Sequence, residues 1–453
     1  MQIKCPSNNI PERKYAIQVL FNNLLGVGLT EQDICFDDSV QDYLISTGGK
    51  QIIVQDHFFQ RFPKPLSYLQ RSNIPDKVDY FHAFGWEIPM VYGVDVFQEE
   101  GDCLTVGLDI FASTFFWMTR WEESLLGRDE KGDCSESQLF SVRNSLHQRP
   151  IVHEYERLLR KLLGGCGVPF KERQYKVILT HDVDGMLTPT YADIVRDFFD
   201  QKKNGPPQNT ILNLTWKSER NYKRAFPTAF SQFEFYTHLA KKYDIVEWFY
   251  FKVCATGEEE ATYCHNDQKV KRVISQLQRL NNPNLLLGFH PSQTTFNNEP
   301  QWDIESQRII ELLGLKPTIG RNHHLLYNLP MLRLWEKTFS SDVSPLDISN
   351  CVFHGRNGFR CGVAVPFPLF DYYDRRQMNL IEHPNQIMDT VIRYNYDHYS
   401  DENRWNGEYS IIDKVKEISG ELVLTWHIYI RRQNIIENGF GWCERMLEYA
   451  VQK

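Results

Sequence analysis

Apolar and polar positions over residues 171–453 alternate between short apolar runs and longer amphipathic stretches. The short runs predict strands at 176–180, 245–253, 284–289, 317–320, 358–363 and 421–426. Helical periodicity between them predicts helices near 190–202, 228–242, 266–280, 303–314 and 409–418. Strands and helices that alternate over about 280 residues are typical of a parallel α/β unit, and this length favours a (β/α) barrel over an open sheet.

The amino-terminal third has a different pattern. Short β-like runs at 50–55 and 103–107 lie between turns rich in Pro, Gly, Asn and Asp. A stretch that begins at Asp109 is apolar on every face and predicts a helix buried between layers. A second helix over 150–163 is followed by glycines and a proline, which indicate a helix end and a linker. We therefore expect a smaller α/β domain over 1–170 and the barrel over 171–453.

Composition supports two folded units. The 453 residues are 42% hydrophobic and 24% charged, as in globular proteins, which excludes disorder for most of the chain. No apolar run is long enough to span a membrane and the first residues resemble no secretory signal, so we expect no membrane span and a cytoplasmic location. A net charge of −8 without a basic block makes nucleic acid an unfavourable partner.

The ten cysteines are spread along the whole chain. They form no Cys-x-x-Cys pair and no tight cluster with histidines, which argues against a structural zinc finger. We expect reduced, mostly buried thiols.

Polar residues follow the predicted strands of the barrel. In such barrels the reacting groups lie just beyond the carboxyl ends of the strands, where the loops converge. The strand ends here carry Asp182, Asp184, His290, Arg321, His323, His324 and His427, and Asp347 and Arg360 extend this set. Their repeated occurrence at strand ends predicts a site at the mouth of the barrel.

Asp182 and Asp184 are alternate residues of an extended segment, so both can face one cavity. Two carboxylates this close favour a shared proton or a bound cation, with one as metal ligand and the other as general base. The alternative is that they cap the next helix or close a turn with Gly185.

His290 follows an apolar strand, where a histidine is either a packed core residue or a ligand. One aspartate, His290 and a further histidine would make a three-ligand set that leaves room for water, as a hydrolytic metal requires. His323 and His324 are the candidates for the third ligand, and only one of the two neighbours can easily face the mouth.

His427, at the end of the last predicted strand, could protonate a leaving group opposite a carboxylate base. The alternative is a hydrogen bond to backbone.

Four aromatic residues could stack on sugar faces, although scattered aromatic residues more often belong to the core. They are Trp302, Tyr327, Trp335 and Trp426.

These segments resemble a known family. Thr180-His-Asp-Val-Asp184 is similar to the first motif of the polysaccharide deacetylases of carbohydrate esterase family 4, in a His-Asp-Val-Asp variant. The resemblance continues, in the expected order, through Gly288-Phe-His-Pro-Ser292, Arg321-Asn-His323, Gly358-Phe-Arg-Cys-Gly362 and Leu424-Thr-Trp-His427. The segments 109–123 and 149–155 resemble the uncharacterised domain that precedes this branch in bacterial surface-polysaccharide gene clusters.

The resemblance implies a distorted (β/α)7-type barrel that removes N-acetyl groups from an N-acetylated saccharide, with zinc or another divalent metal. It implies that Asp182 is the base, Arg321 orients the base and His427 is the general acid. Asp184 and His290 would bind the metal. Asp347, Arg360 and Trp426 are further expected to bind substrate.

The sequence departs from the family pattern at two positions. Val183 separates the two aspartates, which are adjacent in better-known members, and Thr294 replaces a second histidine four residues after His290. We expect His323 to supply the third ligand. A barrel that binds glycan without hydrolysing it is the alternative, and phosphoester hydrolysis by His181 and Asp182 is a second rival.

Overall fold

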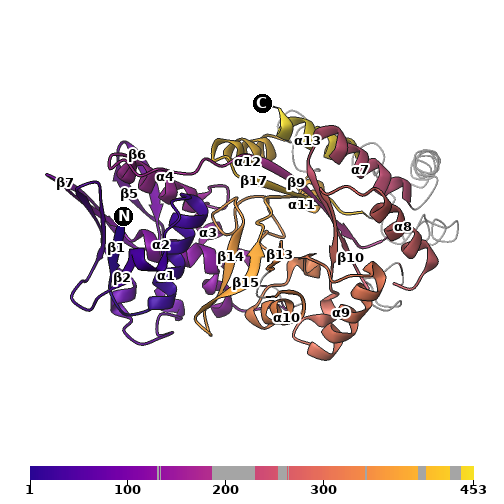
Figure 1. The fold of residues 1–453 in the computed structure, drawn as a ribbon, viewed down its shortest axis with the longest axis horizontal. Coiled ribbons are helices and arrows are strands. Elements are labelled where there is room, and N and C mark those ends of the chain that lie inside the picture. Colours follow the sequence, from indigo (N-terminus) through magenta and orange to yellow (C-terminus); the bar gives the residue numbers. More distant parts are fainter. Residues whose placement is uncertain are drawn as a thin grey trace, which may run out of the picture. The chain divides into compact units, whose positions relative to one another are not determined.

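The computed structural model describes residues 1–129, 132, 134–185, 230–253, 263, 265–341, 344–395, 405–428 and 440–452. The chain forms two compact units (Figure 1). Unit 1 comprises Met1–Tyr175, Leu325–Ile387 and Trp405–Leu422, and unit 2 comprises Lys176–His324, Met388–Arg404 and Val423–Lys453. Two segments that the sequence places in the barrel, 325–387 and 405–422, therefore belong to the same unit as the amino-terminal third.

Unit 1 contains a mixed sheet. Its order is β2 (Ile34–Phe36), β1 (Gln2–Cys5), β3 (Tyr43–Thr47), β4 (Lys50–Val54), β8 (Cys103–Leu108) and β7 (Gly93–Glu100). The pairs β1–β2 and β4–β8 are parallel, and the other neighbouring pairs are antiparallel. A separate hairpin joins β5 (Asp79–Ala83) and β6 (Trp86–Met90). Both strands that the sequence predicts in this region, β4 and β8, are confirmed.

The helices of the amino-terminal third are α1 (Ile10–Gln18), α2 (Ile110–Thr119), α3 (Phe140–Arg143) and α4 (Ile151–Gly164). Every residue of α2 is buried, as its uniformly apolar sequence predicts. The side chain of Asp109 accepts a hydrogen bond from the backbone N–H of Ala112 and so caps the first turn.

The returning segments add α10 (Leu329–Phe339), β13 (Leu346–Ile348), β14 (Phe367–Asp371), β15 (Arg376–Glu382) and α12 (Asn406–Glu417) to unit 1. The predicted strand at 358–363 is wrong, because this segment has no regular secondary structure. Gly358 and Gly362 have φ angles of +149° and +70°, which L side chains rarely adopt and which interrupt an extended strand.

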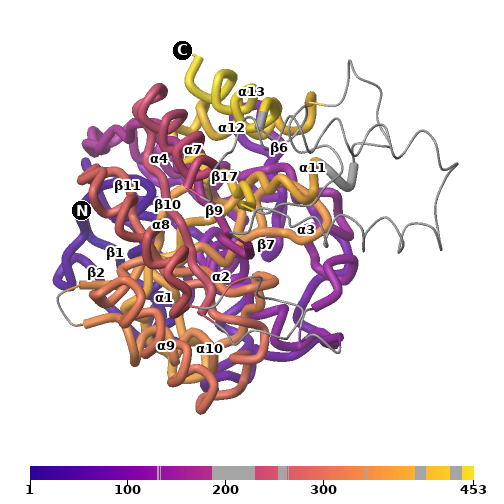
Figure 2. Tube along the Cα trace, turned by 90° about the vertical axis from the view of Figure 1, so that its right-hand side faces the viewer, coloured from indigo at the N-terminus to yellow at the C-terminus, as the bar shows by residue number. Residues whose placement is uncertain are grey.

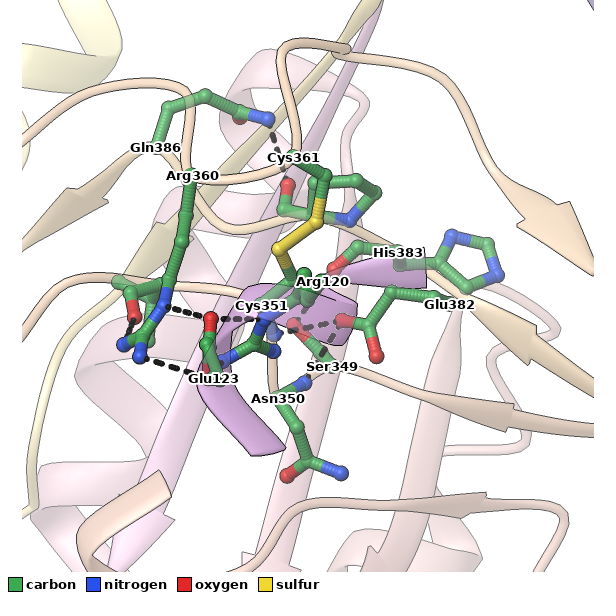
Figure 3. The surroundings of a disulfide bond; sticks show 12 residues. Arg120, Glu123, Ser349, Asn350, Cys351, Arg360, Cys361, Glu382, His383 and Gln386 are labelled. Atoms are coloured by element: carbon green, nitrogen blue, oxygen red, sulfur yellow. Dashed lines mark hydrogen bonds and ion pairs between the residues drawn. A yellow bond between two sulfur atoms is a disulfide. The ribbon is translucent and has the colours of Figure 1, made fainter. Parts of the chain in front are cut away.

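A disulfide joins Cys351 and Cys361 across this irregular loop (Figure 3). The expectation of reduced thiols is therefore wrong for these two cysteines, because the loop brings residues ten positions apart within bonding reach. Of the free cysteines that the structure describes, Cys5, Cys134 and Cys443 are buried, whereas Cys35 is exposed.

Unit 2 is built on a sheet in which β12 (Ile319–Gly320), β11 (Leu285–Phe289), β10 (Val246–Phe251), β9 (Lys176–Val183) and β17 (Glu421–Thr425) are neighbours in this order. The pairs β9–β10, β10–β11 and β11–β12 are parallel. The strands predicted at 176–180, 245–253, 284–289, 317–320 and 421–426 are all confirmed.

The register aligns the carboxyl ends of these strands. Val183 pairs with Phe251, Phe251 with Phe289, and Phe289 with Gly320. The residues that follow these four ends therefore lie at one edge of the sheet, which is the edge where parallel α/β proteins bind ligands. β17 extends this edge, because Trp426 and Ile428 donate backbone hydrogen bonds to Thr180 and Asp182 of β9.

Helices α7 (Phe230–Tyr243), α8 (Gln268–Arg279), α9 (Glu299–Leu313), α11 (Asp389–Asn395) and α13 (Phe440–Val451) complete the described part of unit 2. α7 and α13 lie side by side (Figure 2), and Lys242 bridges Glu444 between them at 2.8 Å. The helix predicted near 190–202 lies outside the described residues.

Strand–helix alternation in unit 2 agrees with the predicted α/β class, and β16 (Ile387–Met388) adds a short strand beside β17. The complete (β/α)7 barrel stays a prediction. Among the residues that the structure describes, no helix combines the length and the apolar character needed to cross a bilayer.

Candidate active site

Asp182 and Arg321 form a buried ion pair at the carboxyl edge of the sheet. Nη1 of Arg321 lies 2.9 Å from Oδ1 of Asp182, and it also donates to the hydroxyls of Thr180 and Thr425. Arg321 is fully buried, and its guanidinium stands 4.7 Å from the ring centre of Tyr250. These contacts fix the position of the guanidinium, and its charge then fixes Asp182.

His290 presents one ring nitrogen to the two aspartates. Its Nδ1 lies 2.7 Å from the carbonyl oxygen of Arg321, so Nδ1 carries the proton and Nε2 keeps its lone pair. Nε2 lies 3.6 Å from Oδ1 of Asp184 and 3.9 Å from Oδ2 of Asp182. A carbonyl that holds the far nitrogen is the usual arrangement behind a metal-binding histidine.

His323 completes a cluster of three possible ligands. One ligand atom from each of Asp184, His290 and His323 lies within 4.8 Å of the other two. His324 takes a left-handed conformation at φ +53° and is exposed, whereas His323 is half-buried, although the centres of the two rings lie 4.0 Å apart. Of the two candidates that the sequence leaves open, only His323 belongs to this cluster.

The three side chains suit a divalent metal. One carboxylate oxygen and two imidazole nitrogens are the ligand types of catalytic zinc sites. Nε2 of His290 is buried and, within the described part of the chain, makes no hydrogen bond. Its lone pair is therefore available to bind a metal. The donor set therefore fits the metal that the family resemblance implies.

Lys252 is part of the cluster and is absent from the sequence-based expectations. It follows β10, and its Nζ lies 3.0 Å from Oδ1 of Asp184 and 2.8 Å from Nε2 of His323. Its side chain is fully buried. The predicted strand at 245–253 includes Lys252, whereas β10 ends at Phe251, so the error in the predicted strand end hid this polar residue.

His427 is held by Asp389, which the sequence analysis also missed. Nδ1 of His427 lies 2.7 Å from Oδ1 of Asp389, and the backbone N–H of His427 donates to Oδ2. The other ring nitrogen, Nε2, lies 3.8 Å from Oδ2 of Asp182. Asp389 therefore orients the imidazole so that Nε2 faces Asp182.

The charges of the site separate the pKa values of its acid and base candidates. Burial alone raises the pKa of Asp182, but the charges of Arg321 and His427 act in the opposite direction, and the pKa lies below the ordinary value. Burial alone lowers the pKa of His427, but Asp389 and then Asp182 raise it to about 9. At neutral pH Asp182 is therefore ionised and His427 is protonated.

The segment Thr180–Asp184 also contains His181, whose side chain does not contact the ligand cluster. Its Nδ1 lies 2.8 Å from the carbonyl oxygen of Trp426, and its Nε2 lies 3.3 Å from a carboxylate oxygen of Glu247. The ring is fully buried and stacks on Phe249. His181 therefore supports the strand, and this geometry does not favour phosphoester hydrolysis by His181 and Asp182.

Asp347 and Arg360, two expected substrate contacts, belong to unit 1. Arg360 is buried and donates to both carboxylate oxygens of Glu123, so its charge is neutralised inside that unit. Asp347 lies 3.4 Å from Nε2 of His383. The contact of both residues with substrate stays a prediction.

The aromatic residues considered for sugar stacking belong to the core. Trp302, Trp335 and Trp426 are fully buried, and Tyr327 is 5% exposed. Burial does not favour sugar stacking by Trp426, and its contact with substrate stays a prediction.

Comparison with known proteins gives limited similarity. A family of unknown function (DUF7033) matches residues 1–166. The search of curated proteins returns no match. A candidate polysaccharide deacetylase involved in O-antigen biosynthesis from Bordetella bronchiseptica is 12% identical, with 56% of this chain and 72% of that chain covered and a TM-score of 0.29. A candidate polysaccharide deacetylase from Mycobacterium smegmatis is 10% identical, with 63% and 86% covered and a TM-score of 0.35.

Proposed function

We propose that unit 2 is a metal-dependent hydrolase that removes N-acetyl groups from an N-acetylated sugar or polysaccharide precursor. The observation that carries this proposal is the convergence of Asp184, His290 and His323 at the carboxyl edge of the sheet. These three side chains would hold the ion, most suitably zinc, which when bound polarises the amide carbonyl and lowers the pKa of water.

Asp182 is the general base in this proposal. Its low pKa keeps it ionised, and Arg321 holds its Oδ1 so that Oδ2 faces the side of His290 and His427. There Oδ2 can take a proton from the water that attacks the amide carbon. Thr180 and Thr425 fix the guanidinium of Arg321, and the base is therefore preorganised.

His427 is the general acid. Asp389 holds its Nδ1, and Nε2 is the nitrogen that can donate a proton to the departing amine as the C–N bond breaks. Water adds to the acetyl carbon, and acetate and the free sugar amine are the products. The proposal that the acyl group is acetyl rests on the ordered motifs from His181 to His427, which resemble those of the polysaccharide deacetylases.

The test combines metal content with acetate release. Purified protein saturated with zinc should bind one ion and release acetate from N-acetylhexosamine oligomers. His323→Ala should lose zinc affinity, whereas His324→Ala, its exposed neighbour, should bind zinc like the wild type. Equal zinc binding by both variants, or no binding by the wild type, would reject the proposed metal site.

The rival function is glycan binding without hydrolysis. It is motivated by Thr294, which stands where the family has a second histidine and which shares a hydrogen bond of 2.7 Å with Ser292. The rival predicts binding of N-acetylated saccharides with neither zinc binding nor acetate release, so the same two measurements separate the functions.

A further inference from the structure

Lys252 occupies a position inside the proposed ligand cluster. Its ammonium contacts two of the three ligand residues, at 3.0 Å from Oδ1 of Asp184 and 2.8 Å from Nε2 of His323. Both atoms are also able to bind a metal. A cation supplied by the chain itself therefore lies among the groups that would hold a metal cation.

Hydrogen bonds of the backbone fix the position of the main chain at Lys252. Its N–H donates to the hydroxyl of Tyr263, which in turn donates to the carbonyl oxygen of Val183 at the end of β9. Both hydrogen bonds measure 2.8 Å, and Tyr263 is itself buried. Tyr263 thus ties the ends of β9 and β10 together and directs Lys252 and Asp184 to the same place.

Burial makes the ammonium costly to move. The side chain of Lys252 is fully buried, and a buried charge needs a nearby opposite charge. Asp184, which is 24% exposed at its side chain, supplies it. If a divalent ion binds Asp184, the ammonium faces a second positive charge at the carboxylate that it now contacts.

We propose that Lys252 competes with the metal for Asp184 and His323 and so sets the metal affinity of the site. This inference rests on the proposed function. A metal bound about 2 Å from Oδ1 of Asp184 would lie within about 5 Å of the ammonium in its present position. Even with the dielectric constant of water, repulsion at that distance lowers affinity by on the order of tenfold.

The experiment measures zinc affinity directly. Lys252→Met removes the charge and keeps an unbranched side chain, and the zinc dissociation constant is obtained by competition with a chromophoric chelator. We expect zinc to bind Lys252→Met at least about tenfold more tightly than the wild type. Lys242→Met, which removes an exposed lysine of α7, serves as the matched control and should bind zinc like the wild type.

Thermal unfolding provides a second measurement, for which the direction of each change in unfolding temperature is predicted. Without metal, Lys252→Met should unfold at a lower temperature than the wild type, because the buried ion pair between Lys252 and Asp184 is lost. Saturating zinc should raise its unfolding temperature by more than it raises that of the wild type, since tighter binding stabilises more. A purely structural lysine would leave the zinc-induced increase unchanged. Lys252→Gln repeats both measurements if the methionine variant does not fold.

The outcomes separate this inference from the proposed function. Zinc affinity of Lys252→Met that equals or falls below that of a zinc-binding wild type overturns the competition and leaves the metal site standing. If neither protein binds zinc while both remain folded, the proposed metal site fails and the competition fails with it.

Discussion

Each unit contains one buried cluster of charged residues, around Glu123 in unit 1 and around Asp182 and Asp184 in unit 2. The two clusters differ in the distances between their charged groups. In unit 1, Glu123 accepts hydrogen bonds from Arg120 at 2.6 and 2.8 Å and from Arg360 at 3.1 Å for each oxygen (Figure 3). The two guanidinium groups saturate the carboxylate, and the pKa of Glu123 falls to about 2 because their charges outweigh the effect of burial.

In unit 2, the Nε2 atoms of His290 and His427 approach Asp182 and Asp184 only to 3.6–3.9 Å. These distances exceed hydrogen-bond length, although the groups are buried and converge on one point. Arg321 and Lys252 pair closely with these aspartates, at 2.9 and 3.0 Å, but the two imidazoles are held from their far sides by a carbonyl and by Asp389. The comparison teaches that full pairing around Glu123 stabilises the fold, whereas imidazoles with separate supports leave space for a reaction. The following experiments test this distinction, from the largest expected effect to the smallest.

Asp182→Asn should have the largest effect. Loss of the carboxylate removes the proposed base, and turnover should fall by about a thousandfold, within the usual range for general bases. Zinc should still bind, because Asp182 is outside the proposed ligand set. Acetate release and zinc stoichiometry measured on one preparation check this. Full activity of the variant would contradict the role given to Asp182.

Glu123→Ala should affect stability instead of chemistry. It leaves the charges of Arg120 and Arg360 buried without their carboxylate, and the free energy of unfolding should fall by about 3–5 kcal/mol. Urea unfolding followed by circular dichroism measures this. A loss of less than about 1 kcal/mol would show that the cluster of unit 1 behaves like a surface ion pair.

The disulfide of unit 1 should contribute somewhat less. Cys351 and Cys361 are ten positions apart, and closing a loop of this length stabilises a protein by about 3 kcal/mol. The double variant Cys351→Ser/Cys361→Ser should lose this amount under oxidising conditions. A reducing agent should destabilise the wild type but not the double variant, and equal sensitivity of both would argue against the disulfide.

Asp389→Asn should change the pH dependence of the proposed reaction. His427 acts as an acid only while protonated, so kcat/KM of the wild type should fall as pH rises through about 9. Burial lowers this pKa and the charge of Asp389 raises it, so the variant should lose activity at a lower pH. At pH 8 we expect a loss of about tenfold. An unchanged alkaline limb would exclude His427 as the titrating group.

The sequence by itself determined where the strands of unit 2 lie along the chain and most of the polar residues that follow them. Apolar runs reveal strands locally, and polar residues after them reveal the edge where a site can form, so a candidate set that contains Asp184, His290 and His323 could be chosen without coordinates. The family resemblance, not the pattern, favoured Asp184 over Asp182 as the ligand. Lys252 was missed because the predicted strand at 245–253 ran past it, whereas β10 ends at Phe251. Asp389 had no such signal, because its importance comes only from its contact with His427.

Tertiary structure decided which way neighbouring residues face and which segments belong together. His324 has a positive φ angle and is exposed, whereas His323 belongs to the ligand cluster, and a carboxylate of β10 holds His181 away from the site. The return of residues 325–387 to unit 1 and the disulfide within them depend on contacts between distant parts of the chain. Local hydrophobic periodicity carries no information on such contacts, because their energy exists only once the segments have packed.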